Sequence, residues 1–263
     1  MNSHAQNMTH WSERVDLAAA FRWTARLNMH EAVANHFSFA INDDGTKFLM
    51  NPNQMHFSRI KASDMIVVDA NDPETLSGPN APDPTAWGLH GGIHRHVPHA
   101  RCAMHVHSVF ATVLASLKDS RLPPIDQNCC TFFNRYVIDE GYGGLAFEEE
   151  GERCASLFTD PKKRVMIMGN HGVLIIGETV AETFNRMFYF ERAVETYIRA
   201  LQTGQQNHYR RLGAKIQLAV ATTHKGDQLS VDDLYQRLSR GETAQHFFAY
   251  GLFPNLLYKV FNH

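Results

Sequence analysis

Three histidines in this chain have the spacing of a metal site. His105 and His107 are separated by one residue in the segment Ala103–Ser108, and His171 lies far downstream in the segment Gly169–Gly172. In an extended strand alternate side chains share one face, so His105 and His107 are predicted to point the same way. Two imidazoles from one strand and a third from a distant turn can hold a divalent metal with coordination positions left open for a substrate. Because the chain has 16 histidines, the spacing alone also allows ordinary surface or core histidines.

Composition narrows the class of protein. Apolar residues make up 44% of the 263 residues, charged residues make up 20%, and the formal net charge is −2. These values are typical of a folded domain and give no reason to expect binding to nucleic acid or to an anionic membrane. No apolar stretch approaches the roughly 20 residues that span a bilayer, and the polar N-terminal segment lacks the apolar centre of a signal peptide. The four cysteines show no C-x-x-C spacing, so we expect reduced thiols in a cytoplasmic protein.

The pattern of apolar residues predicts alternating helices and strands that would position these histidines. Helices are expected over residues 12–28, 84–97, 108–117 and 179–201, and strands over 36–41, 47–50, 65–69, 101–107, 165–168 and 173–176. Asp83 before Pro84 is typical of a helix N-cap with proline at the first helical position. Thr179 and Glu182 form the pattern of a capping box.

One domain is predicted for residues 1–205, with a helical extension over residues 206–263. Ser230 and Asp233 mark the expected start of a helix that runs to about Ala249. The tail beyond it is apolar for the end of a chain, so we expect it to pack on its own domain or on a neighbouring subunit.

Four blocks, taken in order over about residues 12–202, resemble the class II aldolase/adducin head family. The first is Asn35–Ser38, which resembles an early N-x-S strand. The second is Leu89–His90 in the helix that precedes the histidine strand. The third and fourth are Ala103–Ser108 and Gly169–Gly172, which resemble the V-x-H-x-H-(S/T) strand and the x-N-H-G turn.

The resemblance implies a fold, a cofactor and an assembly. The fold is an α/β class, a three-layer α/β/α sandwich around a largely antiparallel central sheet. His105, His107 and His171 are implied to bind a divalent metal, most often zinc, with manganese or iron as alternatives. Family members are usually homotetramers with sites at subunit interfaces, and they act on small molecules.

Two departures from the family pattern bear on the chemistry. Aldolase members carry a glutamate near the start of the helix that precedes the histidine strand, and Ala86 takes that place here. Alanine can neither bind a metal nor move a proton, so aldol cleavage would need another acid or base. Phosphate-binding loops need small residues with free backbone N–H groups, whereas this chain has bulk and proline at Asn35–Phe37 and Met50–Gln54. An unphosphorylated substrate is therefore expected, with Asn35, His36, His90 and Asn53 as substrate-binding candidates.

Replacements for the missing glutamate can be proposed from two segments. His90 and His94 follow Ala86 at helical spacing, so all three share roughly one face, and His94 is a catalytic candidate. A stretch expected to be rich in loops contains a second set of candidate proton donors, which are Tyr136, Asp139, Glu140 and Tyr142. Among these, Tyr136 and Glu140 are taken as the catalytic candidates.

The sequence favours a metal-dependent enzyme that acts on an unphosphorylated carbonyl or carboxylate compound, most simply a C–C lyase that works by aldol-type cleavage or decarboxylation. Three neutral imidazoles leave the charge of a divalent ion without an offsetting carboxylate, which suits an enolate oxygen. A non-heme iron oxygenase is an alternative, although the commoner iron triad includes a carboxylate. A non-catalytic scaffold, as in the adducins, is the other alternative. Because all three histidines are retained, an enzyme is preferred.

Overall fold

The computed structural model describes residues 9–78, 80–143 and 148–205. The helical extension expected over residues 206–263 lies outside these described residues, and so does its helix from Ser230 to Ala249. The remaining chain contains the whole of the expected histidine site.

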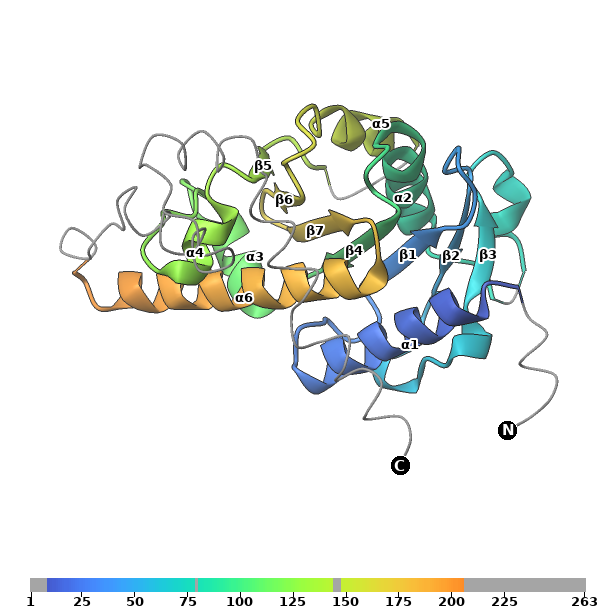
Figure 1. The fold of residues 1–263 in the computed structure, drawn as a ribbon, viewed down its shortest axis with the longest axis horizontal. Helices are drawn as coiled ribbons and strands as arrows, with labels where there is room; N and C mark the ends of the chain where they lie inside the picture. The colour runs from blue at the N-terminus through green and yellow to red at the C-terminus, as the bar shows by residue number, and fades with distance from the viewer. Residues whose placement is uncertain (1–8, 79, 144–147, 206–263) are drawn as a thin grey trace, which may run out of the picture.

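Seven strands form one open, mixed sheet in the order β3-β2-β1-β4-β7-β6-β5 (Figure 1). The strands are β1 (His36–Ala40), β2 (Lys47–Met50), β3 (Ile66–Asp69), β4 (Cys102–Val106), β5 (Tyr136–Asp139), β6 (Val165–Met168) and β7 (Gly172–Gly177). Every neighbouring pair is antiparallel except β5 with β6, which is parallel. The expectation of a largely antiparallel sheet is therefore confirmed.

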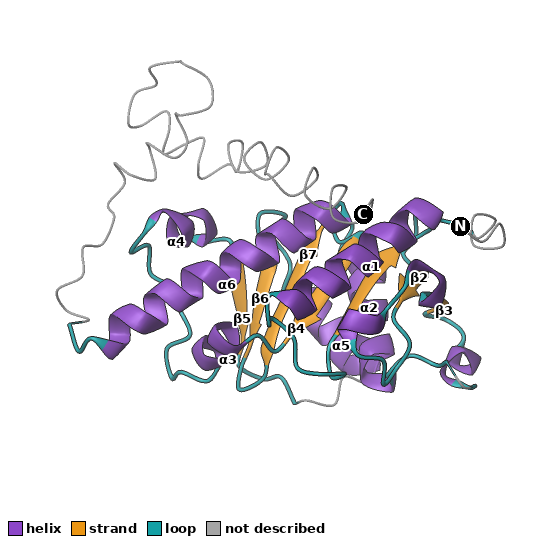
Figure 2. Cartoon of the chain, turned by 90° about the horizontal axis from the view of Figure 1, so that it is seen from below, coloured by secondary structure: helices purple, strands orange, loops and turns teal. Residues whose placement is uncertain are grey.

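Helices cover both faces of the sheet. On one face lie α1 (Trp11–Arg26) and the long α6 (Val180–Gln202), with α3 (Val109–Ala115) and α4 (Gln127–Phe132) beside α6 (Figure 2). On the other face lie α2 (Pro84–His96) and α5 (Glu148–Ser156) (Figure 1). Three short 3-10 turns, Phe57–Arg59, Ala62–Asp64 and Pro73–Leu76, complete the described elements. The result is the three-layer sandwich that the resemblance implied.

The alternation of side chains along the strands divides the core into two layers. On β4, Cys102, Met104 and Val106 pack into the large core under α1 and α6. Ala103, between them, belongs instead to the core under α2 and α5. His105 follows the same alternation as Ala103, which sets it on the α2 side.

The helix starts follow their capping residues closely. Asp83 Oδ1 accepts hydrogen bonds from the N–H groups of Thr85 and Ala86, and Pro84 occupies the first turn of α2. At α6, Thr179 Oγ1 accepts from the Glu182 N–H at 3.1 Å. The Glu182 carboxylate accepts from the N–H of Glu178 at 2.9 Å and not from that of Thr179, so only half of the predicted capping box forms.

The stretch expected to be rich in loops contains three regular elements, α4, β5 and α5. Asp126 caps α4 by accepting from the Cys129 N–H at 2.7 Å. β5 has only four residues at the edge of the sheet and is held by β6, some 30 residues further along the chain. The expectation of a loop was wrong here because a four-residue edge strand depends on a distant partner more than on its own pattern.

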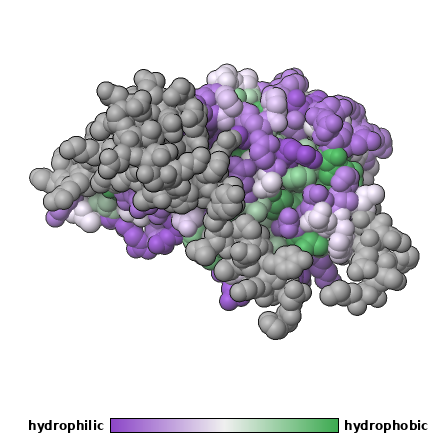
Figure 3. Space-filling view, in the orientation of Figure 1, coloured by the Kyte–Doolittle hydropathy of each residue, from purple (hydrophilic) through white to green (hydrophobic). Residues whose placement is uncertain are grey.

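On the face shown in Figure 3, the described residues that are in view are mostly hydrophilic, with small hydrophobic patches among them. Within the described residues, no helix is both long enough and apolar enough to cross a bilayer.

Glycines allow α2 and α5 to approach each other closely. A Cβ at Gly151 in α5 would collide with the carbonyl group of Gly88 in α2, and a Cβ at Gly92 would collide with the backbone of Gly151. The backbones of the two helices are therefore in direct contact, and this contact holds α2 against the sheet.

We predict that Gly151→Ala lowers the free energy of unfolding by about 1–3 kcal/mol, because the added methyl group must push α2 and α5 apart. Helix propensity alone would raise the free energy of unfolding by about 1 kcal/mol, so the decrease expected from the clash has the opposite sign. Urea denaturation measures the change. Gly143→Ala is the control, since nothing lies within 4 Å of a Cβ there. Equal or higher stability of Gly151→Ala would contradict the close contact.

Candidate metal centre

Three imidazoles meet at one end of β4. His105 lies on β4, His107 follows it, and His171 lies in the turn between β6 and β7. The Nε2 atoms of His105 and His107 are 2.8 Å apart, and those of His107 and His171 are 3.1 Å apart. The rings of His105 and His171 are stacked with centroids at 5.0 Å. The three histidines expected to form a metal site are thus brought together by the fold.

The turn that carries His171 depends on its two neighbours. Asn170 has a φ of 55°, a left-handed conformation that asparagine tolerates better than most residues. A Cβ on Gly172 would lie 2.5 Å from the Val106 carbonyl oxygen and 2.8 Å from Cδ2 of His107. The N-H-G sequence is therefore required because the turn packs directly on the end of β4.

Hydrogen bonds from the Nδ1 atoms of His105 and His107 to other groups of the protein turn the Nε2 atoms of the two rings toward each other. His105 Nδ1 donates to the Val173 carbonyl oxygen at 3.0 Å, so the Nε2 of the neutral ring carries no proton. His107 Nδ1 donates to Oε2 of Glu31 at 2.5 Å, which leaves its Nε2 bare in the neutral ring as well. Two bare nitrogens at 2.8 Å repel each other unless they share a cation, so the donor set fits a metal ion.

Burial keeps the rings of His105 and His171 deprotonated, as metal binding requires. Burial, and then the neighbouring histidines, lower the pKa of His105 well below its ordinary value. Burial, and then His107, lower the pKa of His171 to about 4. Glu31 orients His107 in the way that a carboxylate orients a histidine ligand of zinc.

A second group of metal-ligand types is an ion-pair network. Asp139, Glu150 and Cys154 lie within 4.8 Å of one another. The Arg153 guanidinium donates two hydrogen bonds to the buried Asp139, at 2.8 and 2.7 Å, and also binds Glu150. Because the cation already present is this guanidinium, the group anchors α5 to the end of β5.

Three of the residues expected to bind substrate, Asn35, His36 and Asn53, line a small inner pocket of about 260 Å³ together with Asp83 and Ala86. His36 is the first residue of β1, Asn35 directly precedes it, and Ala86 lies on α2. His36 also stacks on His105, with centroids at 4.8 Å, so the pocket adjoins the metal-ligand group. Ala86 therefore lies beside the site, as its alignment with the family glutamate requires.

The other histidine candidates lie behind the pocket. His90 Nε2 is 2.7 Å from His36 Nδ1, and His94 Nε2 is 2.6 Å from Ser38 Oγ. His94 Nδ1 donates to the Ala100 carbonyl oxygen at 2.7 Å, so both of its ring nitrogens are engaged with the protein. His90 and His94 are therefore placed to act on His36 and not directly on a ligand.

Tyr136 and Glu140, the two catalytic candidates from the stretch around β5, lie away from the three histidines, whereas Tyr142 lies beside His171. The Tyr136 side chain packs in the core under α6, on the far side of the sheet, and its hydroxyl oxygen accepts from the Leu122 N–H at 2.9 Å. Glu140 is exposed just after β5. Tyr142, from the same stretch, lies with its ring centroid 4.6 Å from that of His171. Burial raises the pKa of Tyr142, which keeps its hydroxyl protonated.

Sequence reasoning missed Glu31 and Ser38. Glu31 lies in an irregular segment between α1 and β1, where no spacing rule links it to His107, 76 residues away. Ser38 is part of the Asn35–Ser38 block, and its place on the His36 face of β1 was a usable signal, since residues two apart share a face.

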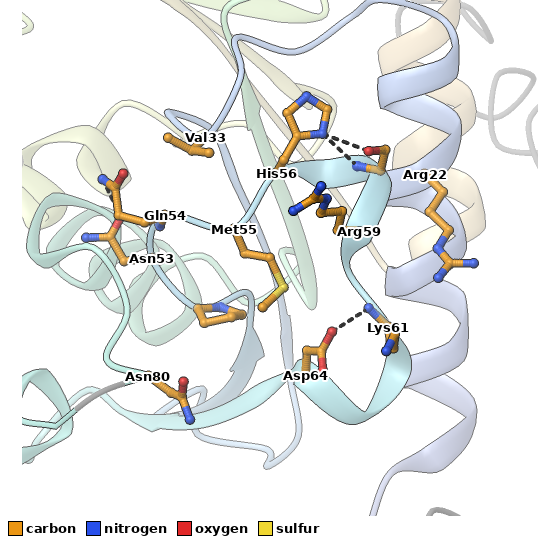
Figure 4. Close-up of a pocket in the computed structure, with 12 residues that line it drawn as sticks. Arg22, Val33, Asn53, Gln54, Met55, His56, Arg59, Lys61, Asp64 and Asn80 are labelled. Atoms are coloured by element: carbon orange, nitrogen blue, oxygen red, sulfur yellow. Dashed lines mark hydrogen bonds between the residues drawn. The ribbon is translucent and has the colours of Figure 1, made fainter.

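A larger, open groove of about 1040 Å³ continues outward from the inner pocket. The two share Val33, Asn53 and Gln54. Figure 4 shows Asn53 and Gln54 on one side of this outer groove and Arg22, Arg59 and Lys61 on the other. Asn53, predicted to bind substrate, therefore lies where the inner pocket opens into a groove with a cationic wall.

Comparison with known proteins identifies the family. Residues 15–198 match the family described as class II aldolase and adducin N-terminal domain, so the chain belongs to the class II aldolase/adducin family. It is similar to the crystal structure of an aldolase II superfamily protein from Pseudomonas syringae. That likeness has a TM-score of 0.72 and 26% identity, and covers 92% of this chain and 99% of the other.

Two similar proteins come from Streptomyces. One, from Streptomyces roseochromogenus, is named 4-hydroxy-3-prenylphenylpyruvate oxygenase/4-hydroxy-3-prenylbenzoate synthase and is 30% identical over 165 residues, which are 62% of this chain and 58% of the relative. The other, from Streptomyces niveus, is named decarboxylase NovR and is 29% identical over 165 residues, 62% of this chain and 60% of the relative. Proteins similar to this chain are thus named for more than one reaction.

We predict that Glu31→Gln weakens metal binding by about 10- to 100-fold, the usual effect of losing a partner of a metal-binding histidine. His107→Ala should remove most of the bound metal. Metal content after dialysis against a graded chelator measures both effects. His96→Ala, at an exposed histidine on α2, is the control. A His107→Ala protein that retained its full metal content would contradict the assignment.

We also predict that the metal-free protein loses stability as the pH falls from about 6.5 to about 4. Burial lowers the pKa of His94 from 6.5 to about 4, so between these values the unfolded chain binds more protons than the folded one. Stability therefore rises with pH across this window, by on the order of 3 kcal/mol for this one residue. Urea denaturation in EDTA at several pH values should show a smaller slope for His94→Gln. An unchanged slope would contradict the buried neutral His94.

Proposed function

We propose that this protein is a divalent-metal-dependent lyase that cleaves or decarboxylates an unphosphorylated carbonyl or carboxylate compound. The observation that carries the proposal is the convergence of the His105, His107 and His171 imidazoles, whose Nε2 atoms lie 2.8–3.1 Å apart along the group. A bound zinc, manganese or iron ion would act as a Lewis acid toward a carbonyl or enolate oxygen, with no carboxylate among its three ligands to offset its charge. Zinc is the simplest choice.

The inner pocket supports an unphosphorylated substrate. Pro52 has no N–H group, the N–H of Asn53 donates to the Ala81 carbonyl oxygen at 3.0 Å, and the N–H of Gln54 donates to Asn53 Oδ1 at 2.8 Å. In this segment of the pocket wall, the backbone donors that could hold a phosphate are therefore absent or already used. The cationic wall of the outer groove favours a substrate that carries a negative charge elsewhere.

Three groups of the chain have roles in the proposed reaction. His36 and Asn35 face the substrate from the inner pocket. Tyr142, protonated and packed on His171, is the group that we propose as the proton donor to the carbon left by bond cleavage. Tyr136 is left out because its hydroxyl lies across the sheet.

An iron-dependent oxygenase is the second candidate. It is favoured by the name of the Streptomyces roseochromogenus relative, which assigns that protein an oxygenase reaction. A scaffold without catalysis is the third, since the family takes part of its name from adducin. The retained histidines and the pocket beside them weigh against the scaffold.

Metal analysis combined with an oxygen electrode separates the three candidates. We expect protein purified without added metal to carry zinc or manganese, and to consume no oxygen when mixed with a panel of 2-oxo and 2-hydroxy carboxylates. Iron with substrate-dependent oxygen uptake would replace the lyase by the oxygenase. Protein without any metal, even after incubation with zinc, would favour the scaffold.

We further propose a homo-oligomer, a tetramer as is usual in the family, in a reducing cytoplasmic compartment. All four cysteines are free, and burial raises the pKa of Cys102 and of Cys154 to about 12. Val109 and Val113 lie one turn apart on α3, which follows β4 in the chain, and their exposed fractions are 57% and 38%. Such an apolar pair beside the site suits a subunit contact.

We predict that the protein elutes as an oligomer in light scattering at micromolar concentration and that Val109→Lys lowers its mass. The reason is that a lysine ammonium would have to be buried in the contact. Val67→Lys, at an exposed valine on edge strand β3, is the comparison. A monomeric wild-type protein would contradict the proposed assembly.

A further inference from the structure

A chain of hydrogen bonds runs behind the inner pocket from a backbone carbonyl to His36. The Ala100 carbonyl oxygen lies 2.7 Å from His94 Nδ1, and His94 Nε2 lies 2.6 Å from Ser38 Oγ. Ser38 Oγ is in turn in hydrogen-bond contact with His90 Nδ1, and His90 Nε2 lies 2.7 Å from His36 Nδ1. All four side chains are buried, and three of them are histidines. This chain of groups is called the histidine relay below.

The carbonyl at its end fixes the direction of every hydrogen bond in the relay. A carbonyl only accepts, so His94 Nδ1 carries the proton and the Nε2 of the neutral ring is bare. Ser38 then donates its single hydroxyl proton to His94 Nε2 and must accept from His90 Nδ1. Neutral His90 has a bare Nε2, which accepts from His36 Nδ1. Burial supports the neutral forms by lowering the pKa of His94 to about 4 and that of His90 well below its ordinary value.

The relay therefore leaves His36 with one unused hydrogen-bond acceptor. Its Nδ1 is used inside the protein, and its Nε2 must be a bare acceptor. That nitrogen makes no hydrogen bond to any residue that the structure describes. Since His36 lines the inner pocket, Nε2 is the ring nitrogen left for a ligand, and it accepts only from a donor such as a hydroxyl.

Asn35, the neighbour of His36, supplies the opposite kind of group. Its Oδ1 accepts from the Glu31 N–H at 2.7 Å, which identifies the other amide atom as the NH₂ group. Nδ2 is buried and has no hydrogen-bond partner among the described residues, although Asn35 is only 1% exposed. A buried donor without a partner is uncommon and calls for an explanation, and a ligand oxygen in the inner pocket would provide one.

We propose that the inner pocket recognises a hydroxyl group next to a carboxylate or carbonyl oxygen, as in a 2-hydroxy acid, through His36 Nε2 as acceptor and Asn35 Nδ2 as donor. The proposal rests on the proposed function and narrows its substrate class. In this proposal His36 binds the ligand directly. Ser38, His90 and His94 are positioning residues that set the tautomer of His36. A ligand that offers an acceptor in place of the hydroxyl would meet a second lone pair at His36 and bind less well.

The tautomers are tested first, in protein labelled with ¹⁵N-histidine and stripped of metal by EDTA. Magic-angle-spinning NMR at neutral pH distinguishes a protonated from a bare ring nitrogen, and difference spectra against His36→Phe and His94→Gln assign the signals. We expect Nδ1–H with bare Nε2 for both His36 and His94. A proton on Nε2 of His36 would overturn the proposal, and this measurement needs no variant of the relay serine.

Ligand recognition is tested with glycolate and fluoroacetate, which differ in one group of similar size that can or cannot donate a hydrogen bond. Calorimetry on zinc-loaded protein should show tighter binding of glycolate. His36→Phe should reduce that preference by about tenfold, the loss of one hydrogen bond between buried groups. His96→Phe, at the exposed histidine of the same α2, should keep it.

A matched variant tests the partner group. Asn35→Asp retains the oxygen that accepts from the Glu31 N–H and loses the NH₂ donor. It should therefore weaken the binding of both acids and leave the ratio of their affinities unchanged. A preference for glycolate that survives in His36→Phe, or no binding of either acid to the zinc-loaded wild-type protein, would overturn the paired recognition.

Failure of this proposal is distinguishable from failure of the proposed function. A protein that takes up no metal but shows the expected tautomers would contradict the metal-dependent lyase and leave the relay intact. A metal-loaded protein with a proton on Nε2 of His36 would contradict the relay and leave the metal centre intact.

Discussion

The central place of β4 in the sheet is the constraint on which the site depends. β4 is hydrogen-bonded to β1 on one side and to β7 on the other, in registers that set His105 opposite His36 and opposite Leu174. The pairing with β1 brings the inner-pocket residues next to His105, and the pairing with β7 brings the turn that carries His171. A slip of one residue in either pairing would turn the partner side chains to the other face of the sheet. Both long-range contacts of the site therefore rest on the two antiparallel registers of β4.

The histidines beneath the pocket are a polar group inside an otherwise apolar layer. Burying an imidazole without partners costs about 1–3 kcal/mol, so each ring must be satisfied by a neighbour. His90, His94 and Ser38 satisfy one another and end on a backbone carbonyl. The same hydrogen bonds that make burial tolerable also fix which nitrogen carries a proton. Stability and ligand recognition are in this way two results of one network.

The charge pattern around the site follows a consistent logic. The three metal-binding candidates are imidazoles, and Glu31 lies next to the group, where its carboxylate accepts a hydrogen bond from His107 and orients that ring. Between α5 and the end of β5, Asp139, Glu150 and Arg153 neutralise one another in a separate network. No carboxylate is placed directly among the three Nε2 atoms in the described chain, and Ala86 lines the pocket beside them with a methyl group.

The amino-acid sequence by itself determined the metal-binding candidates and the local elements that carry them. The period-2 pattern of β4, the Asp83-Pro84 start of α2 and the Asn170-His171-Gly172 turn are local signals, because each depends on backbone geometry within a few residues. Only the tertiary structure decided which other groups reach the site. Glu31 meets His107 across 76 positions, Tyr142 reaches His171 while Tyr136 turns to the other face, and His94 is held by Ser38 and not by a ligand. These contacts could not be read from spacing, since they are set by the pairing of distant strands and by the depth at which α2 packs on the sheet.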